Sequence, residues 1–284
     1  MNIKKVLINA VDYLKKHNIP NSRLEAEVLL AHVLHIERIQ LYVKYDLPLK
    51  KNELEKYREL IVKRAKRTPT AYLTGVKEFM SLDFTVNNKV LIPRPETEIL
   101  VEKVIEYCQE QEMDSPNIVD IGTGSGVIAV SLGYNIKNAR VFGIDISSEA
   151  LKIACRNISK FDLGDRVKVT RGNLLQPLIK LDKDNVDIVI SNPPYISSQK
   201  MKELMPEVQR EPDLALAAGA DGLKFYREII PQSARVLKAG GLLALEIGYA
   251  QGDAVKKLFD SSWQNVRVEK DYSDHDRMVF ANLK

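Results

Sequence analysis

From residue 117 onward, short apolar segments alternate with longer helical segments, and this alternation limits the fold more than any other feature. The apolar segments are rich in β-branched residues and bounded by polar residues or glycine, as buried strands are. Strands that alternate with helices form mostly parallel sheets covered by helices on both faces. The pattern therefore predicts a doubly wound α/β sheet of seven strands. Five strands are expected at 117–121, 140–144, 167–170, 186–190 and 241–247, with two antiparallel edge strands at 266–270 and 278–281.

The first 75 residues show apolar residues at helical spacing instead. Helices are expected at 2–16, 22–33, 38–43 and 51–66. Ser22 and Glu25 match a capping box, which predicts that the second helix begins at Ser22. This part is interpreted as a small helical domain spanning residues 1–75.

Between the two patterns, a linker at residues 76–96 is expected to contain a β-hairpin. Its strands are predicted at 82–86 and 90–92, because apolar residues alternate there around the turn-forming pair Asn87-Asn88. The sheet domain is then expected to span residues 97–284.

The segment Ser191-Asn192-Pro193-Pro194-Tyr195 follows the predicted strand at 186–190. It therefore lies at a carboxyl end, where open α/β sheets bind ligands. Two consecutive prolines stiffen this loop. The Asn192 side-chain oxygen and a backbone carbonyl of the proline pair can accept both hydrogens of a planar NH2 group, and Tyr195 can stack on its plane. Such acceptors localise the nitrogen lone pair by orientation and electrostatics. A plain turn, with Asn as a cap and Pro-Pro as a stop, remains the alternative.

A second loop, Gly122-Thr123-Gly124-Ser125-Gly126, follows the first predicted strand, and Asp145 ends the next one. Glycines permit a tight turn and close approach of a ligand, and a carboxylate at a strand end can accept both hydroxyls of a ribose. The spacing is not that of a dinucleotide site, because position 127 is Val rather than Gly. S-adenosylmethionine needs no pyrophosphate cradle, and it offers an adenosine to Asp145 and an amino-acid end to the glycine loop.

The third predicted strand ends at Gly172-Asn173-Leu174. Asn173 is a candidate partner for the adenine amine, and Leu174 is a candidate to pack on the ring. The alternative for Asn173 is a simple turn residue.

Composition excludes several classes of protein. The chain has 284 residues, is 45% hydrophobic, and contains no apolar run long enough for a signal peptide or a membrane span. Cys108 and Cys155 form no disulfide framework, and the four histidines form no metal-binding motif. We expect a globular cytoplasmic protein without a metal ion and without a membrane partner.

Charge is distributed unevenly along the chain. Residues 1–80 contain 16 Lys and Arg against 9 Asp and Glu, whereas residues 81–284 contain 26 against 29. The basic excess includes the run Lys63-Arg64-Ala65-Lys66-Arg67. The simpler interpretation of this run is a solvated helix end. The more specific interpretation is a binding surface for a partner with acidic patches or for RNA.

Together these motifs resemble a known family. Asp120 to Gly126 with Asn192 to Tyr195 resemble class I S-adenosylmethionine-dependent methyltransferases that act on planar NH2 groups. Further stretches narrow the resemblance to the release factor glutamine methyltransferases of the HemK/PrmC type, over nearly the whole chain. These stretches are Thr68 to Gly75, Leu91 to Glu98, Glu211-Pro212, Asp221 to Leu223, and Leu245 to Gly248.

The resemblance implies methylation of the side-chain amide nitrogen of the glutamine in a Gly-Gly-Gln motif of peptide chain release factors. S-adenosylmethionine would be the cofactor and S-adenosylhomocysteine the product. It implies that Asn192 and the Pro193 carbonyl hold the glutamine NH2, with Pro194 and Tyr195 completing the substrate site. The implied cofactor residues are Gly122, Thr123, Gly124, Ser125, Gly126, Asp145, Asn173, Leu174 and Asn192. Relatives often carry Asp and then an aromatic residue where Asn173 and Leu174 stand, so we expect a weaker adenine contact.

Two other functions stay open at this point. A nucleic-acid amino methyltransferase would use the same Asn192 loop on adenine or guanine, and the basic first domain favours it. However, no separate target-recognition domain is visible, and base-flipping enzymes need a large basic cleft, so no stable nucleic-acid partner is expected. A binding module without catalysis is the third possibility. We expect a monomer, with the helical domain docking the release factor.

Overall fold

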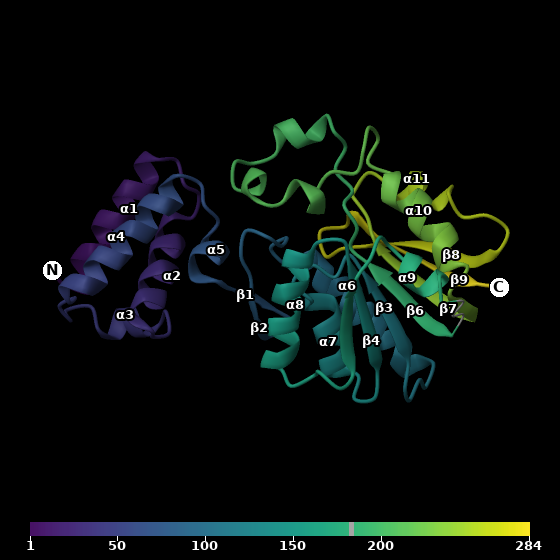
Figure 1. The fold of residues 1–284 in the computed structure, drawn as a ribbon. Coiled ribbons are helices and arrows are strands. Elements are labelled where there is room, and N and C mark those ends of the chain that lie inside the picture. Colours follow the sequence, from purple (N-terminus) through teal and green to yellow (C-terminus); the bar gives the residue numbers. More distant parts are fainter. Residues whose placement is uncertain (182–184) are drawn as a thin grey trace. The chain divides into compact units, whose positions relative to one another are not determined.

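The computed structural model describes residues 1–181 and 185–284, and these fall into two compact units (Figure 1). The helical unit consists of Met1–Val76 together with Met205–Arg210. The sheet unit consists of Lys77–Leu204 and Glu211–Lys284. Across the described residues, none of the helices is both long and apolar enough to span a bilayer.

The helical unit is built on amphipathic helices. The first is α1 (Ile3–Lys16), and its buried residues Ile3, Val6, Leu7, Ala10 and Leu14 recur at helical spacing. They pack against buried residues of α2 (Ser22–Leu34) and α4 (Lys51–Ala65), with α3 (Gln40–Val43) closing the cluster. These four helices confirm the predicted ones. A fifth short helix, α5 (Thr70–Thr74), follows Pro69 and was not expected.

The predicted capping box at Ser22 is wrong. The N-cap of α2 is Asn21, with a φ of 50°, and the Ser22 hydroxyl donates instead to the Ile19 carbonyl over 2.5 Å. The Glu25 carboxylate accepts a hydrogen bond from Arg64 Nε over 3.0 Å. Arg64 is only 3% exposed, and a buried guanidinium needs an anionic partner more than a helix end needs a second cap.

The sheet unit contains seven strands in the order β5-β4-β3-β6-β7-β9-β8. They are β3 (Asn117–Ile121), β4 (Arg140–Asp145), β5 (Val167–Arg171), β6 (Val186–Ser191), β7 (Leu237–Glu246), β8 (Trp263–Lys270) and β9 (Asp276–Leu283). The first five pair in parallel, and β9 pairs antiparallel with β7. The predicted seven-stranded, mostly parallel sheet is confirmed.

The two strands predicted at the sheet edge are β8 and β9, and each pairs antiparallel with its neighbours, as predicted. Only β9 runs against the parallel strands, and β8, which is antiparallel to β9, runs with them at the sheet edge. The cause is the tight turn between the two strands, in which the Asp271 amide donates to the His275 carbonyl over 2.8 Å. Strands joined by such a turn must oppose each other, so both cannot oppose β7.

The predicted hairpin exists, but at another position. Its strands are β1 (Val76–Phe79) and β2 (Leu82–Thr85), and the segment 90–92 is not a strand. Met80 and Ser81 form the turn with φ of 52° and 59°, which matches the twist of a two-residue hairpin. The Glu98 carboxylate accepts a hydrogen bond from the Met80 amide over 2.9 Å. This bond stabilises a turn that the residue types Met and Ser do not predict.

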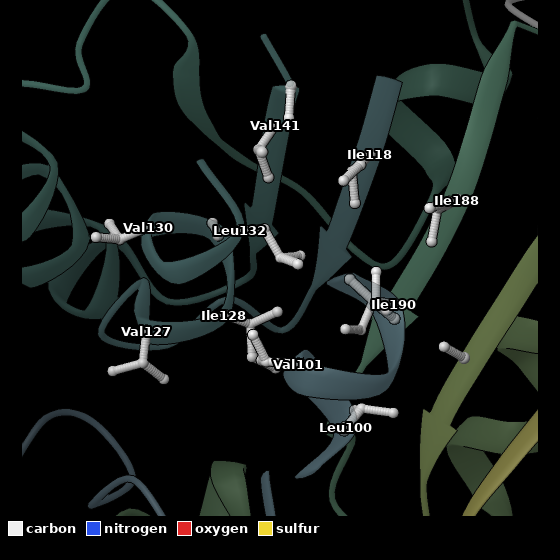
Figure 2. Packing of buried hydrophobic residues seen from close by; sticks show 14 of the residues in the cluster. Leu100, Val101, Ile118, Val127, Ile128, Val130, Leu132, Val141, Ile188 and Ile190 are labelled. Atoms are coloured by element: carbon white, nitrogen blue, oxygen red, sulfur yellow. The ribbon is translucent and has the colours of Figure 1, made fainter. Parts of the chain in front are cut away.

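Helices cover both faces of the sheet (Figure 1). The first face carries α6 (Pro95–Glu110), α7 (Val127–Asn135) and α8 (Ser148–Lys160), and the second carries α9 (Gln176–Ile179), α10 (Lys224–Ser233) and α11 (Gly252–Lys256). Successive strand residues point to opposite faces, so Ile118 joins the first core and Val119 the second. Figure 2 shows residues of α6 and α7 packed toward Ile118, Ile188 and Ile190 in the first core.

The carboxyl ends of the parallel strands are level with one another. Ile121 is in register with Ile144 on β4 and with Ser191 on β6. The strand order reverses between β3 and β6, and this is the switch point at which open α/β sheets bind ligands. The glycine loop, Asp145 and the Asn192 loop all follow strands that end here.

Candidate active site

A cavity of about 360 Å³ lies at the carboxyl ends of β3, β4, β5 and β6, within the sheet unit. Its walls come from the loops after these strands and from three further segments of the same unit. The strand loops contribute Gly122, Gly124, Asp145, Ile146, Ser147, Gly172, Asn173, Leu174, Asn192, Pro193 and Pro194. The other segments contribute Lys89, Val90, Leu91, Pro212, Leu214, Ala215, Lys224 and Phe225. A cavity of this size suits a small organic molecule.

The glycine loop opens its backbone toward the cavity. Gly122 and Gly124 have φ of 70° and 56°, a region that other residues rarely adopt. A Cβ atom built on Gly122 would meet no other atom within 4 Å, so open space lies beside the backbone. At Gly126 a Cβ would come within 3.2 Å of the Ala154 Cβ, so this glycine serves helix packing instead.

Asp145 ends β4 and lines the cavity. Its Oδ2 atom accepts the Gly124 amide and its Oδ1 atom accepts the Ser147 amide, each over 2.8 Å. Burial raises the pKa of Asp145, although these amide hydrogen bonds oppose the shift. These amides fix the orientation of the carboxylate beside the cavity, and a carboxylate has about four lone pairs.

The loop after β5 forms an apolar part of the wall. Asn173 and Leu174 both line the cavity, and Leu174 is held in the left-handed region with a φ of 49°. Val90, Ile146 and Phe225 line it as well. Apolar side chains with one amide among them suit a flat, partly polar ring.

Asn192 stands on the opposite side of the switch point and is tied to the core. Its Nδ2 atom donates to Thr97 Oγ1 over 2.9 Å, and the Thr97 hydroxyl donates to Glu246 Oε2 over 2.6 Å. The Tyr195 hydroxyl donates to Glu246 Oε1 over a longer 3.4 Å. Burial raises the pKa of Glu246 to about 7 and also raises the pKa of Tyr195.

The predicted site residues therefore divide into two groups. Gly122, Gly124, Asp145, Asn173, Leu174, Asn192, Pro193 and Pro194 line one cavity. Thr123, Ser125, Gly126 and Tyr195 are not among the lining residues. The Thr123 hydroxyl donates to Asp120 Oδ2 over 2.6 Å, and the Ser125 carbonyl accepts from Asn157 over 2.8 Å, so both stabilise the loop from behind. The roles of all these residues in binding stay predictions.

From the sequence, no role in the site was assigned to Lys89, Val90, Phe225 or Glu246. Lys89, Val90 and Phe225 carry no signal of such a role, because they are ordinary basic and apolar residues. Glu246 does carry one, since it is the only charged residue in the apolar run Leu242–Ile247, and a charge in a buried strand requires a partner. Among residues 1–181 and 185–284, no three His, Cys, Asp or Glu side chains are grouped so as to hold a metal ion.

Two family models match successive parts of the chain. The family model described as the PrmC N-terminal domain matches residues 5–75, and the methyltransferase small domain matches residues 96–273. A methyltransferase structure from Pyrococcus furiosus is similar in fold, with a TM-score of 0.51 at 17% identity, covering 72% of this chain and 90% of that one.

Two curated relatives extend over almost the whole chain. The release factor glutamine methyltransferase of Moorella thermoacetica is 42% identical, and the alignment covers 99% of this chain and 98% of the relative. That of Clostridium acetobutylicum is 40% identical with the same coverage. Identity at this level over full length goes beyond a shared fold and confirms the resemblance seen in the sequence. The chain belongs to the family of release factor glutamine methyltransferases.

Proposed function

We propose that this enzyme methylates the side-chain amide nitrogen of the glutamine in the Gly-Gly-Gln motif of peptide chain release factors, with S-adenosylmethionine as the methyl donor. The observation that carries the proposal is that Asn192 lines the same cavity as Gly122, Gly124 and Asp145. A carboxamide suited to an NH2 group therefore faces a site suited to an adenosine. The names of the relatives supply the class of substrate.

The residues of the cavity suit this cofactor. Asp145 has lone pairs for the ribose hydroxyls, and Asn173 and Leu174 offer a polar and an apolar contact for the adenine. The open space beside the Gly122 backbone would hold the amino-acid end. When bound, S-adenosylmethionine supplies a methyl group on a positively charged sulfur.

The chain's own residues prepare the nucleophile. An amide nitrogen is a poor nucleophile because its lone pair is delocalised into the carbonyl. Asn192 Oδ1 and the Pro193 carbonyl would accept its two hydrogens and localise that lone pair. The nitrogen held in this way would accept the methyl group that the bound cofactor supplies, with S-adenosylhomocysteine as the second product. The methylated nitrogen is strongly acidic at this stage, so its extra proton passes to water and no strong base is required.

The helical unit is proposed to dock the release factor. Basic residues exceed acidic ones in residues 1–80 by 16 to 9, and charge complementarity accelerates association with an acidic partner surface. We propose that residues 1–75 bind the release factor, that residues 76–96 link this part to the methyltransferase domain at 97–284, and that the enzyme acts as a cytoplasmic monomer.

The test is mass spectrometry of a purified release factor after incubation with the enzyme and S-adenosylmethionine. We expect a gain of one methyl group on the glutamine of Gly-Gly-Gln, and no gain on a substrate in which that glutamine is replaced by asparagine. Cofactor binding is measured separately by calorimetry, so that an inactive preparation is recognised.

A nucleic-acid substrate is the competing outcome, because the Asn192 loop suits a base NH2 equally well and the helical unit is basic. Methylation of DNA or RNA oligonucleotides without methylation of the release factor would reverse the proposal. Cofactor binding with neither reaction would indicate a binding protein.

A further inference from the structure

Three side chains of the sheet unit form a hydrogen-bonded chain that starts at the cavity and ends in the core. Asn192 Nδ2 donates to Thr97 Oγ1 over 2.9 Å, and the Thr97 hydroxyl donates to Glu246 Oε2 over 2.6 Å. Thr97 is 3% exposed and Glu246 is 1% exposed. Solvent therefore offers little competition for these bonds, and each group depends on its neighbour in the chain.

The direction of the chain follows from the chemistry of its last member. An ionised carboxylate only accepts hydrogen bonds, and a threonine hydroxyl has a single hydrogen to give. Once Thr97 has given that hydrogen to Glu246, its oxygen can only accept. The group of Asn192 that faces Thr97 must then be the NH2 group, and the carboxamide oxygen is turned the other way.

We propose that Thr97 and Glu246 are positioning residues that hold the Asn192 carboxamide with Oδ1 toward the cavity, where it accepts a hydrogen bond from the substrate NH2 group. This rests on the proposed function and adds to it two residues that lie outside the cavity wall. Without them the carboxamide could turn over, because its two ends are almost equal in size.

A reversed carboxamide would be inactive. It would present its own NH2 group to the NH2 group of the substrate, so two donors would face each other and one acceptor would be lost. A substrate with its lone pair delocalised would then remain in the site. We call the hydrogen bonds from Asn192 through Thr97 to Glu246 the relay. The relay therefore acts on the catalytic step rather than on the affinity for the cofactor, which Asp145 and the glycine loop determine.

Charge on Glu246 strengthens the orientation. The ionisable or charged groups around it are Glu96 on α6, Tyr195 after β6, Tyr226 on α10 and Arg277 on β9. Its hydrogen-bond donors are hydroxyl groups, and Arg277 acts on it only through its charge. Because burial raises the pKa of Glu246 to about 7, acid supplies a proton that Glu246 itself can donate to Thr97. The Thr97 hydroxyl can then donate to Asn192 instead of accepting from it, so the Asn192 carboxamide is no longer held in one orientation.

The first experiment compares Thr97→Val, Thr97→Ser and Glu246→Gln on methyl transfer to a Gly-Gly-Gln release factor. Thr97→Val keeps the shape without the hydroxyl, and we expect kcat to fall about tenfold or more with KM and the cofactor dissociation constant nearly unchanged. Thr97→Ser restores the hydroxyl and should recover most of kcat. Thr85→Val, on the hairpin strand β2 and away from the cavity wall, is the matched control.

A second readout follows the Asn192 amide directly by ¹⁵N nuclear magnetic resonance, with its signal identified by its absence in Asn192→Ala. In the unaltered protein the signal should shift as pH passes through the titration of Glu246. The shift should vanish in Glu246→Gln and in Thr97→Val. The acid limb of the kcat profile near neutral pH should vanish in Glu246→Gln as well.

The outcomes separate the two proposals. No methyl transfer by the unaltered enzyme to release factor refutes the proposed function, whatever the variants do. Transfer by the unaltered enzyme with full kcat in Thr97→Val, or an Asn192 signal that ignores pH while Glu246 titrates, overturns the relay and leaves the proposed function standing. An equal loss of kcat and of cofactor affinity in Thr97→Val also overturns it, because that pattern indicates general damage to the fold.

Discussion

Glu27 in the helical unit and Glu246 in the sheet unit are both almost completely buried, and the two are compensated in different ways. Glu27 of the helical unit is 2% exposed and accepts from Arg23 Nε over 2.8 Å, from Arg38 Nη1 over 3.3 Å and from the Tyr42 hydroxyl over 2.6 Å. Glu246 of the sheet unit is 1% exposed and accepts from hydroxyl groups, chiefly that of Thr97.

The difference in partners indicates that the Glu27 carboxylate is structural, whereas the Glu246 carboxylate is available for function. Two guanidinium groups neutralise Glu27, and its contacts end at arginines that are more than half exposed. Hydroxyl groups stabilise Glu246 without cancelling its charge, and they lead on to Asn192 at the cavity. Incomplete compensation of a buried charge is costly for stability, and it is found where a site requires the charge.

The largest effect is expected from replacing Asn192, which is the cavity end of the hydrogen-bonded series Asn192–Thr97–Glu246. Asn192→Ala deletes an acceptor for the substrate NH2 group, so we expect kcat to fall by about 10²–10³, as for other preorganised hydrogen-bonding groups. The cofactor dissociation constant should change less than about threefold, because Asp145 and the glycine loop are untouched. Single-turnover methyl transfer and calorimetry measure the two quantities. Equal losses in both would remove Asn192 from the catalytic role proposed for it.

The next effect concerns the pH dependence of stability. A glutamate whose pKa is raised on folding from 4.5 to about 7 stabilises the folded state below pH 4.5, and this contribution is lost as pH rises through 7. The difference corresponds to about 3 kcal/mol. From about pH 5 to about pH 8, unfolding free energy of the unaltered protein should therefore fall relative to Glu246→Gln by up to about 3 kcal/mol.

Urea unfolding at several pH values measures this difference. Burial also raises the pKa of Asp120 to about 7, but Asp120 is present in both proteins and cancels in the comparison. Parallel pH profiles for the two proteins would contradict the raised pKa of Glu246 and would mean that Glu246 stays ionised throughout.

The sequence predicted what local patterns encode. The strands after residue 117 and four helices of the first unit follow from apolar spacing, because that spacing reflects which face of an element is buried. The glycine loop, Asp145 and Asn192 were found because each follows a predicted strand, and parallel strands bring their carboxyl ends to one edge.

The relay could not be found in this way. Thr97 and Glu246 are 149 positions apart, and Thr97 and Asn192 are 95 apart, so their contact depends on packing α6 over β6 and β7. The hairpin was misplaced for another reason. Its turn uses Met80 and Ser81, which have no preference for positive φ. The hydrogen bond from the Met80 amide to the Glu98 carboxylate is again a tertiary contact.

A smaller effect is expected when Glu27 loses its charge. Glu27→Gln breaks two ion pairs, but the side chains of Arg23 and Arg38 are 65% and 53% exposed and can be solvated again. We expect the unfolding free energy of the helical unit to fall by about 1–2 kcal/mol, with the cofactor dissociation constant unchanged. A loss of cofactor affinity, measured by calorimetry, would contradict a purely structural role.

The smallest effect comes from the two tyrosine hydroxyls that reach these glutamates. The Tyr42 hydroxyl lies 2.6 Å from Glu27 and the Tyr195 hydroxyl 3.4 Å from Glu246, and hydrogen bonds weaken steeply over this range. Tyr42→Phe should therefore lower the unfolding free energy by about 1 kcal/mol, and Tyr195→Phe by a few tenths. Because Thr97 remains the chief donor to Glu246, Tyr195→Phe should also keep kcat within about threefold. A larger loss of kcat in Tyr195→Phe, with stability maintained, would show that the 3.4 Å contact tightens when substrate binds, and that Glu246 orients Tyr195 as well as Asn192.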